Sequence, residues 1–129
     1  MVSSANRSAE LLLSLMGIGA EWVQSRSGQS GELITIGWAD GRIGTYRGLR
    51  TASRRYGLQA FTPERMIMEE VSTRYAYRNL CQTIIQAFKD DVAPVPLAET
   101  IEIITIIAAA NTSLDQGGAV IPIDGSRTD

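Results

Sequence analysis

The stretch ELITIGWADGRIGTYRG, residues 32–48, predicts two antiparallel strands joined by a tight turn. Residues 32–38 and 42–48 each have the alternating side chains of a half-buried strand. Between them stands Asp40-Gly41, a dipeptide that accepts the positive φ angles of two-residue hairpin turns. This hairpin fixes the pairing of two strands, and the rest of the fold is predicted outward from it.

The first strand of the hairpin carries large apolar side chains on both faces. Ile34, Ile36 and Trp38 point to one face and Leu33 to the other, because side chains alternate along a strand. An apolar patch left open after helices have packed usually marks an interface, so we expect these four residues to form one. Trp22 and Trp38 have flat rings that stack on sugars, but aromatic residues on a sheet are more often core or interface residues.

Helical periodicity flanks the strands on both sides. Apolar residues recur at helical spacing over 3–16, 73–89 and 97–114, and the last helix, apolar nearly all round, is expected to be buried on more than one side. Further strands are expected at 21–27, 56–61, 65–71 and 120–123. This order predicts an α+β fold, an open, mainly antiparallel sheet with helices packed on one face.

Length and composition predict one soluble domain. The 129 residues include 44% hydrophobic and 20% charged residues and carry a net charge of -2, which is ordinary for a globular protein. We expect residues 1–124 to form this domain and 125–129 a solvated tail. The apolar run 101–110 is interrupted by Glu102 and Thr105 and is shorter than a bilayer span, and the N-terminus lacks a signal-peptide pattern. A cytoplasmic protein without membrane contact is therefore expected.

Residues for acid–base or metal chemistry are scarce. The chain has no histidine and one cysteine, Cys81, which is expected to be a small buried apolar residue of the second helix. Asp90-Asp91 lacks the further oxygen ligands of a cation site, and the carboxylates of Glu69-Glu70 point to opposite faces of a strand. We therefore assign no catalytic residue and no metal site.

Arginines and tyrosines gather around one loop, as in some nucleic-acid-binding surfaces. They are Arg47, Arg50, Arg54, Arg55, Tyr46 and Tyr56. Because the whole chain is net acidic, a solvated or anion-binding loop is favoured, and no nucleic-acid partner is expected.

Three segments carry a family resemblance. WADGRIGTYRGLR, residues 38–50, looks like a hairpin with the pattern W-x-D-G-R-x-G-T, and PVPLAETIEIITIIAAANTSLDQGG, residues 94–118, looks like a closing helix with the pattern PVP-x-x-E-T-x-E-I. SAELLLSLMG, residues 8–17, is similar to the helix after a G-I-H-x-V-E motif. Together they resemble the C-terminal domain of the glucose–fructose oxidoreductase / inositol dehydrogenase / MocA family, over nearly the whole chain.

The resemblance implies one half of a two-domain oxidoreductase. In the family an N-terminal Rossmann domain binds NAD or NADP, and the C-terminal sheet domain lines the substrate pocket and forms dimers or tetramers through its open sheet face. Here Gly17 and Gly19 follow a helix and do not form the G-x-G-x-x-G fingerprint. The family's Lys-Pro dyad is also missing, because the only lysine, Lys89, is followed by Asp90. We therefore expect no cofactor in this chain.

The family's histidine position is also changed. When Glu10 is aligned with the family's Glu, Arg7 replaces a histidine that commonly transfers a proton, and Asn6 precedes it. Arginine stays protonated and cannot act as an ordinary general base. Asn6, Arg7 and Glu10 are the residues expected near a substrate pocket, although Arg7 and Glu10 are equally typical of a surface ion pair. The late start at Met1 and the missing histidine predict a free-standing, trimmed or re-engineered form of the domain.

The resulting expectation is an isolated substrate-binding and oligomerisation domain of an NAD(P)-dependent sugar or polyol oxidoreductase. It is expected to be inactive alone and to form a homodimer or higher homo-oligomer through its sheet face. The alternative is a non-enzymatic module that self-associates as a scaffold or binds a small ligand. An independent enzyme that uses carboxylates is the least supported, because no pair of acids is convincingly placed.

Overall fold

The Asp40-Gly41 turn joins two paired strands in the computed structural model, as the sequence predicts. The strands are β2 (Gly31–Trp38) and β3 (Ile43–Leu49), and they pair antiparallel. Gly41 has a φ of 84°, and its N–H donates to the carbonyl of Trp38 at 2.9 Å. The dipeptide therefore closes the hairpin through the left-handed conformation that glycine tolerates.

The structure describes residues 5–50, 56–72 and 74–123, without the side chains of 5–7 and 56. The chain divides into two compact units, one made of residues 1–51 and 95–129 and the other of residues 52–94. This division differs from the single domain over 1–124 that length suggested. The expected tail at 125–129 lies outside the described residues.

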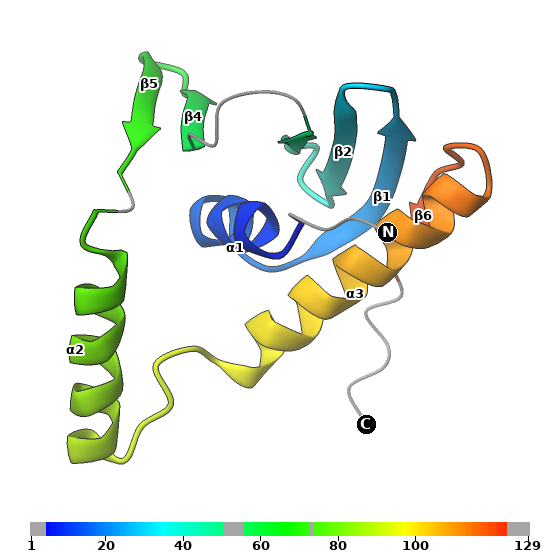
Figure 1. Cartoon of the computed structure of the whole chain (residues 1–129). Coiled ribbons are helices and arrows are strands. Elements are labelled where there is room, and N and C mark those ends of the chain that lie inside the picture. The colour runs from blue at the N-terminus through cyan, green and yellow to red at the C-terminus, as the bar shows by residue number, and fades with distance from the viewer. Residues whose placement is uncertain (1–4, 51–55, 73, 124–129) are drawn as a thin grey trace. The chain divides into compact units, whose positions relative to one another are not determined.

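The larger unit is an open sheet covered by helices. Its remaining elements are α1 (Ala5–Met16), β1 (Ala20–Ser27), α3 (Leu97–Asp115) and β6 (Ile121–Pro122). The strands lie in the order β3-β2-β1-β6, each antiparallel to its neighbour. Helices α1 and α3 pack on one face of this sheet and against each other (Figure 1). The predicted α+β arrangement is thus confirmed.

The core of this unit lies between the helices and the sheet. Its buried apolar residues are Ala9, Leu13, Ala20, Val23, Ile34, Ile36, Trp38, Tyr46, Ile106, Ala109 and Ala110. Ile34 and Ile36 are 0% exposed and Trp38 is 4% exposed. Their expected place in an open interface is therefore wrong, because α1 and α3 cover the face to which they point.

Helix α3 is buried on one side only, contrary to the expectation from its composition. Its buried residues are Ile106, Ala109, Ala110 and Ser113. Among the described residues α3 is also the one helix long and apolar enough to cross a membrane by length and composition, when the whole of Leu97–Asp115 is counted rather than the run 101–110 alone. One such helix is weak evidence for a membrane span, because core helices of soluble proteins pass the same test. In this unit α3 packs on β1.

The smaller unit consists of a hairpin and one helix. Strands β4 (Tyr56–Phe61) and β5 (Met66–Val71) pair antiparallel, and α2 (Ala76–Asp90) follows them. All three were predicted from periodicity. No residue of α2 is buried, so Cys81, expected in a core, is exposed.

Candidate functional site

The face of the larger unit's sheet that points away from α1 and α3 is the candidate site, and we call it the open face. Strand pairing arranges its side chains in three rows that run across β1, β2 and β3. The apolar row is Trp22, Gly37 and Ile43, the neutral polar row is Gln24, Thr35 and Thr45, and the basic row is Arg26, Leu33 and Arg47.

The apolar row is built around a glycine. A Cβ atom on Gly37 would lie 2.1 Å from the indole of Trp22, so the ring occupies the space that a side chain on β2 would need. Trp22 is half-buried by this contact, whereas Ile43 is 61% exposed. The row therefore offers a flat aromatic surface beside an exposed aliphatic side chain.

The other two rows are tied to the turn that follows α3. Gln24 Nε2 donates to the carbonyl of Gly118 at 2.8 Å, and Arg26 Nη1 donates to that of Gly117 at 3.1 Å. These bonds orient two side chains of β1 along the open face. Leu33, the fourth residue of the expected interface, is 39% exposed on this face. The alternation of side chains along β2 predicted that Leu33 points to the face opposite Ile34. No sequence signal predicted the hydrogen bonds of Gln24 and Arg26 to the glycine turn after α3.

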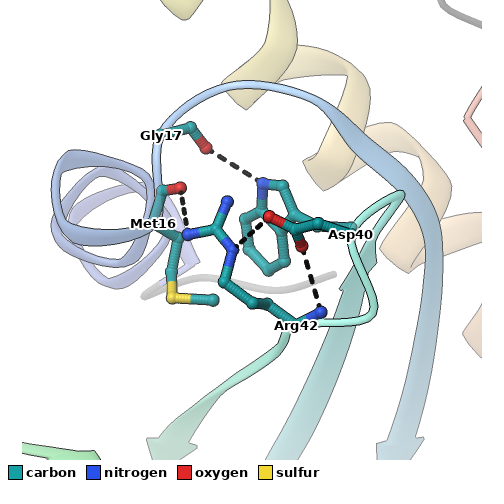
Figure 2. Close-up of polar contacts among 5 residues, drawn as sticks. Met16, Gly17, Asp40 and Arg42 are labelled. Carbon is teal, nitrogen blue, oxygen red and sulfur yellow. Dashed lines mark hydrogen bonds and ion pairs between the residues drawn. The ribbon is translucent and has the colours of Figure 1, made fainter. Parts of the chain in front are cut away.

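Figure 2 shows how the hairpin tip is fixed to the end of α1. Arg42 Nη1 donates to the carbonyl of Met16 at 2.9 Å, and its Nε donates to Asp40 Oδ2 at 2.6 Å. The indole N–H of Trp38 donates to the carbonyl of Gly17 at 3.0 Å. Hydrogen bonds from the backbone and side chain of Arg42 lower the pKa of Asp40. Trp38 and Arg42 therefore anchor the hairpin tip to the segment at the end of α1.

A polar group lies at the other end of the sheet, on the face that the helices cover. Glu32 is 8% exposed, and its Oε1 accepts a hydrogen bond from Arg50 Nη2. Burial, and secondarily the negative charge of Glu32, raises the pKa of Tyr46 to about 12. Tyr46 is 7% exposed, and its hydroxyl is without a hydrogen-bond partner within the part of the chain that the structure describes. This cluster therefore holds a phenol in its neutral form.

The expected substrate-pocket residues all lie in α1. Glu10 is exposed, while the side chains of Asn6 and Arg7 are outside the described ones, so their expected grouping remains a prediction. Two arginines of the expected basic loop, Arg54 and Arg55, also lie outside the described residues.

Other possible sites are limited. The described ranges contain no group of three or more His, Cys, Asp or Glu residues that could hold a metal ion. In the smaller unit, a hollow of about 420 Å³ lies at the C-terminal end of α2. Its lining includes Thr83, Gln86, Asp90 and Pro94, and Asp90 accepts a hydrogen bond from Gln86 at 2.8 Å. One carboxylate held by an amide does not make an acid–base pair.

A scan against protein-family models and searches of curated proteins and of solved structures found no match to this chain.

Proposed function

We propose that the chain is a cytoplasmic, self-associating sheet domain, equivalent to the substrate-binding and oligomerisation domain of an NAD(P)-dependent sugar or polyol oxidoreductase. The observation that carries the proposal is the open face, which holds the exposed apolar side chains Leu33 and Ile43 and the half-buried Trp22 on a sheet whose other face is packed. Burying this face against a second copy covers the same patch twice through one two-fold contact.

The three rows of the open face suit such a contact. A two-fold axis along the neutral polar row places the apolar row of one copy over the basic row of the other. This arrangement keeps the Arg26 and Arg47 side chains of the two copies apart. The aliphatic stem of Arg47 covers Ile43 of the other copy, and the guanidinium of Arg26 over Trp22 of the other copy adds a cation–π interaction. Gln24 and the two threonines then meet their own counterparts, with which they can exchange hydrogen bonds.

Self-association is tested by light scattering coupled to size-exclusion chromatography over a wide range of concentration. We expect a homodimer or higher homo-oligomer whose apparent Kd rises at least about tenfold in Leu33→Lys and Ile43→Lys, because each places a charge in the contact. Leu15→Lys is the matched control, since Leu15 is 50% exposed on α1, which packs on the opposite face. Unchanged mass for both open-face variants, or equal dissociation of the control, contradicts the proposal.

The substrate role rests on Asn6, Arg7 and Glu10. Arg7 supplies a fixed positive charge and hydrogen-bond donors for hydroxyl groups, so the domain binds a sugar or polyol without performing the proton transfer. NMR titration with a panel of sugars and polyols should give saturable shifts that Arg7→Ala and Glu10→Gln weaken and Leu15→Lys leaves unchanged. Turnover is expected only when a separate nucleotide-binding domain presents NAD or NADP. Turnover by the isolated chain contradicts this role.

The second candidate function is a non-enzymatic scaffold or small-ligand module. It is favoured by the same open face, because association through Leu33 and Ile43 needs no substrate. A stable oligomer that binds no sugar or polyol in the titration identifies the scaffold. Binding that is insensitive to Arg7→Ala but weakened by Trp22→Ala identifies a ligand module on the open face.

A further inference from the structure

Helix α2 carries an apolar stripe with the spacing of a helix-pairing seam. The stripe consists of Tyr77, Cys81, Ile84 and Phe88, which follow one another at steps of four, three and four residues, and Leu80 and Ile85 flank it. Steps of this kind place side chains at the a and d positions of a heptad. Tyr77 is 79% exposed, Ile84 42% and Phe88 84%, and no residue of the helix is buried.

We propose that this stripe is a second self-association surface, which pairs antiparallel with α2 of another copy of the chain. It belongs to the smaller unit, whereas the open face belongs to the larger one, and it adds an assembly property to the proposed function without resting on it. Antiparallel pairing about the middle of the stripe sets Tyr77 opposite the partner's Phe88 and Cys81 opposite the partner's Ile84. Each of the four stripe residues of one copy then faces a stripe residue of the other copy.

Charge selects the antiparallel direction and a second copy as the occupant. Arg74 and Arg78 lie at the N-terminal end of α2, where both guanidinium groups stand over the Tyr75 ring at 5.3 and 5.4 Å from its centroid. At the C-terminal end Asp91 is in line with the stripe, whereas Lys89 and Asp90 fall on other sides of the helix. In the antiparallel register Arg74 of each copy meets Asp91 of the other, whereas parallel pairing opposes like charges at both ends.

The surface area that this helix pair buries is small, and a small buried area gives weak pairing. A single pair of helices of this length falls in the class of interfaces below about 1,200 Å², which are usually transient. We therefore expect pairing that depends steeply on protein concentration and weakens with salt, because the end charges are exposed.

Cys81 provides the first test, because it is the only cysteine in the chain and lies in the stripe. A short bis-maleimide added to the whole protein should produce a covalent dimer whose yield rises with protein concentration. Ile84→Asp should reduce this yield at least about tenfold, since it buries a charge in the seam. Asn79→Asp is the matched control on the opposite side of the helix and should leave it unchanged. The rate of labelling by a mono-maleimide verifies that Cys81 is equally reactive in all forms.

Charge reversal provides the second test and separates pairing from helix stability. Arg74→Glu and Asp91→Arg should each lower the cross-linking yield, and the double variant should restore it. Each single change places the charge that the helix dipole favours at that end, so a lower yield cannot come from a melted helix. Circular dichroism of each variant checks the helix directly.

The outcomes are distinct from those of the open-face test. Leu33→Lys should keep the Cys81 cross-link, because Leu33 is on β2 and not in α2. A cross-link lost in Leu33→Lys overturns the separate seam and makes it part of the open-face contact. The absence of any concentration-dependent cross-link in the unaltered protein, or a yield unaffected by Ile84→Asp, overturns the proposal and means that another occupant covers the stripe.

Discussion

Burial in the fold changes the acid–base chemistry of Tyr46. Tyr46 lies on β3 opposite Ile34 of β2, and both belong to the core of the larger unit. Its hydroxyl is buried without a hydrogen-bond partner among the described residues, and desolvation raises its pKa to about 12. The neutral phenol is therefore the form that the native state tolerates.

The raised pKa of Tyr46 predicts a loss of stability at high pH. In the unfolded chain the phenol ionises near pH 10, whereas in the native state it stays protonated up to about pH 12. Between these values the unfolded state binds fewer protons, so the free energy of unfolding should fall by about 1.4 kcal/mol per pH unit. Below pH 10 the contribution is fully present. Denaturant unfolding at a series of pH values between 8 and about 11.5 measures this slope.

Tyr46→Phe is the control for that experiment. Removing an unpartnered buried hydroxyl should leave stability at neutral pH unchanged or slightly higher and should remove the steep part of the slope. A variant with the same loss of stability above pH 10 as the unaltered protein would show that another group titrates there.

At the scale of elements, one carboxylate connects α3 to the start of the sheet. Glu102 on α3 accepts hydrogen bonds from the backbone N–H of Gly19 at 2.8 and 3.0 Å and from that of Ala20 at 2.8 Å. These donors lie where the chain leaves α1 and enters β1, and the φ of Gly19 is 109°. The sequence does not reveal this role. Glu102 is the one charged residue of the apolar run 101–110, and an isolated carboxylate in such a run is typical of a solvent-facing position.

Glu102→Gln should destabilise the larger unit by about 1.5–3 kcal/mol, because a charged acceptor shared by two backbone donors becomes a neutral one. Glu99→Gln, in the first turn of the same helix, should cost only about 0.3–1 kcal/mol through the helix dipole. Urea unfolding of the two variants gives both values. Equal losses contradict the specific role of Glu102.

Sequence patterns predicted the positions of the helices and strands. They did not predict which faces of these elements are buried, because burial depends on which other element packs on each face. The Asp40-Gly41 turn and the periods of two and 3.6 residues located the helices and strands within a few residues. Periodicity separates Leu33 from Ile34 but does not say which side receives the helices, so the core residues of β2 were expected in an interface. Cys81 and the outer side of α3 were expected to be buried for the same reason.

The candidate site was less predictable than the fold. The rows of the open face depend on strand register, and β1 shifts its register against β2 between Ala20 and Trp22. The contact of Trp22 with Gly37 follows from that pairing and has no local sequence signal. The bonds of Gln24 and Arg26 to the glycines after α3 join segments about ninety residues apart.

At the scale of the whole molecule, the two units differ in how they are stabilised. The larger one has a shared core of two helices and a four-stranded sheet. The smaller one has a two-stranded hairpin and a helix without a buried residue. A two-stranded hairpin is marginally stable by itself, so most of the native free energy is expected to reside in the larger unit.

Hydrogen exchange of the whole chain tests this difference. At a concentration at which the chain is monomeric, backbone amides of α2 and of the β4–β5 hairpin should exchange on the order of a hundredfold or more faster than those of β1 and β2. Backbone amides of α3 on the side that packs against the sheet should exchange as slowly as those of β1 and β2. Equal protection of α2 and β1 would mean that the smaller unit has a packing partner in solution.

The larger unit is assembled from residues 1–51 and 95–129, on either side of the smaller one. During synthesis on the ribosome β1, β2 and β3 therefore emerge before α3, and the part of the sheet on β1 that α3 covers stays exposed in the meantime. A nascent chain with such an exposed sheet is a substrate for chaperones and a starting point for aggregation. Helix α3, which is translated after the smaller unit, therefore completes the core, and a chain released before that point lacks this cover on its sheet.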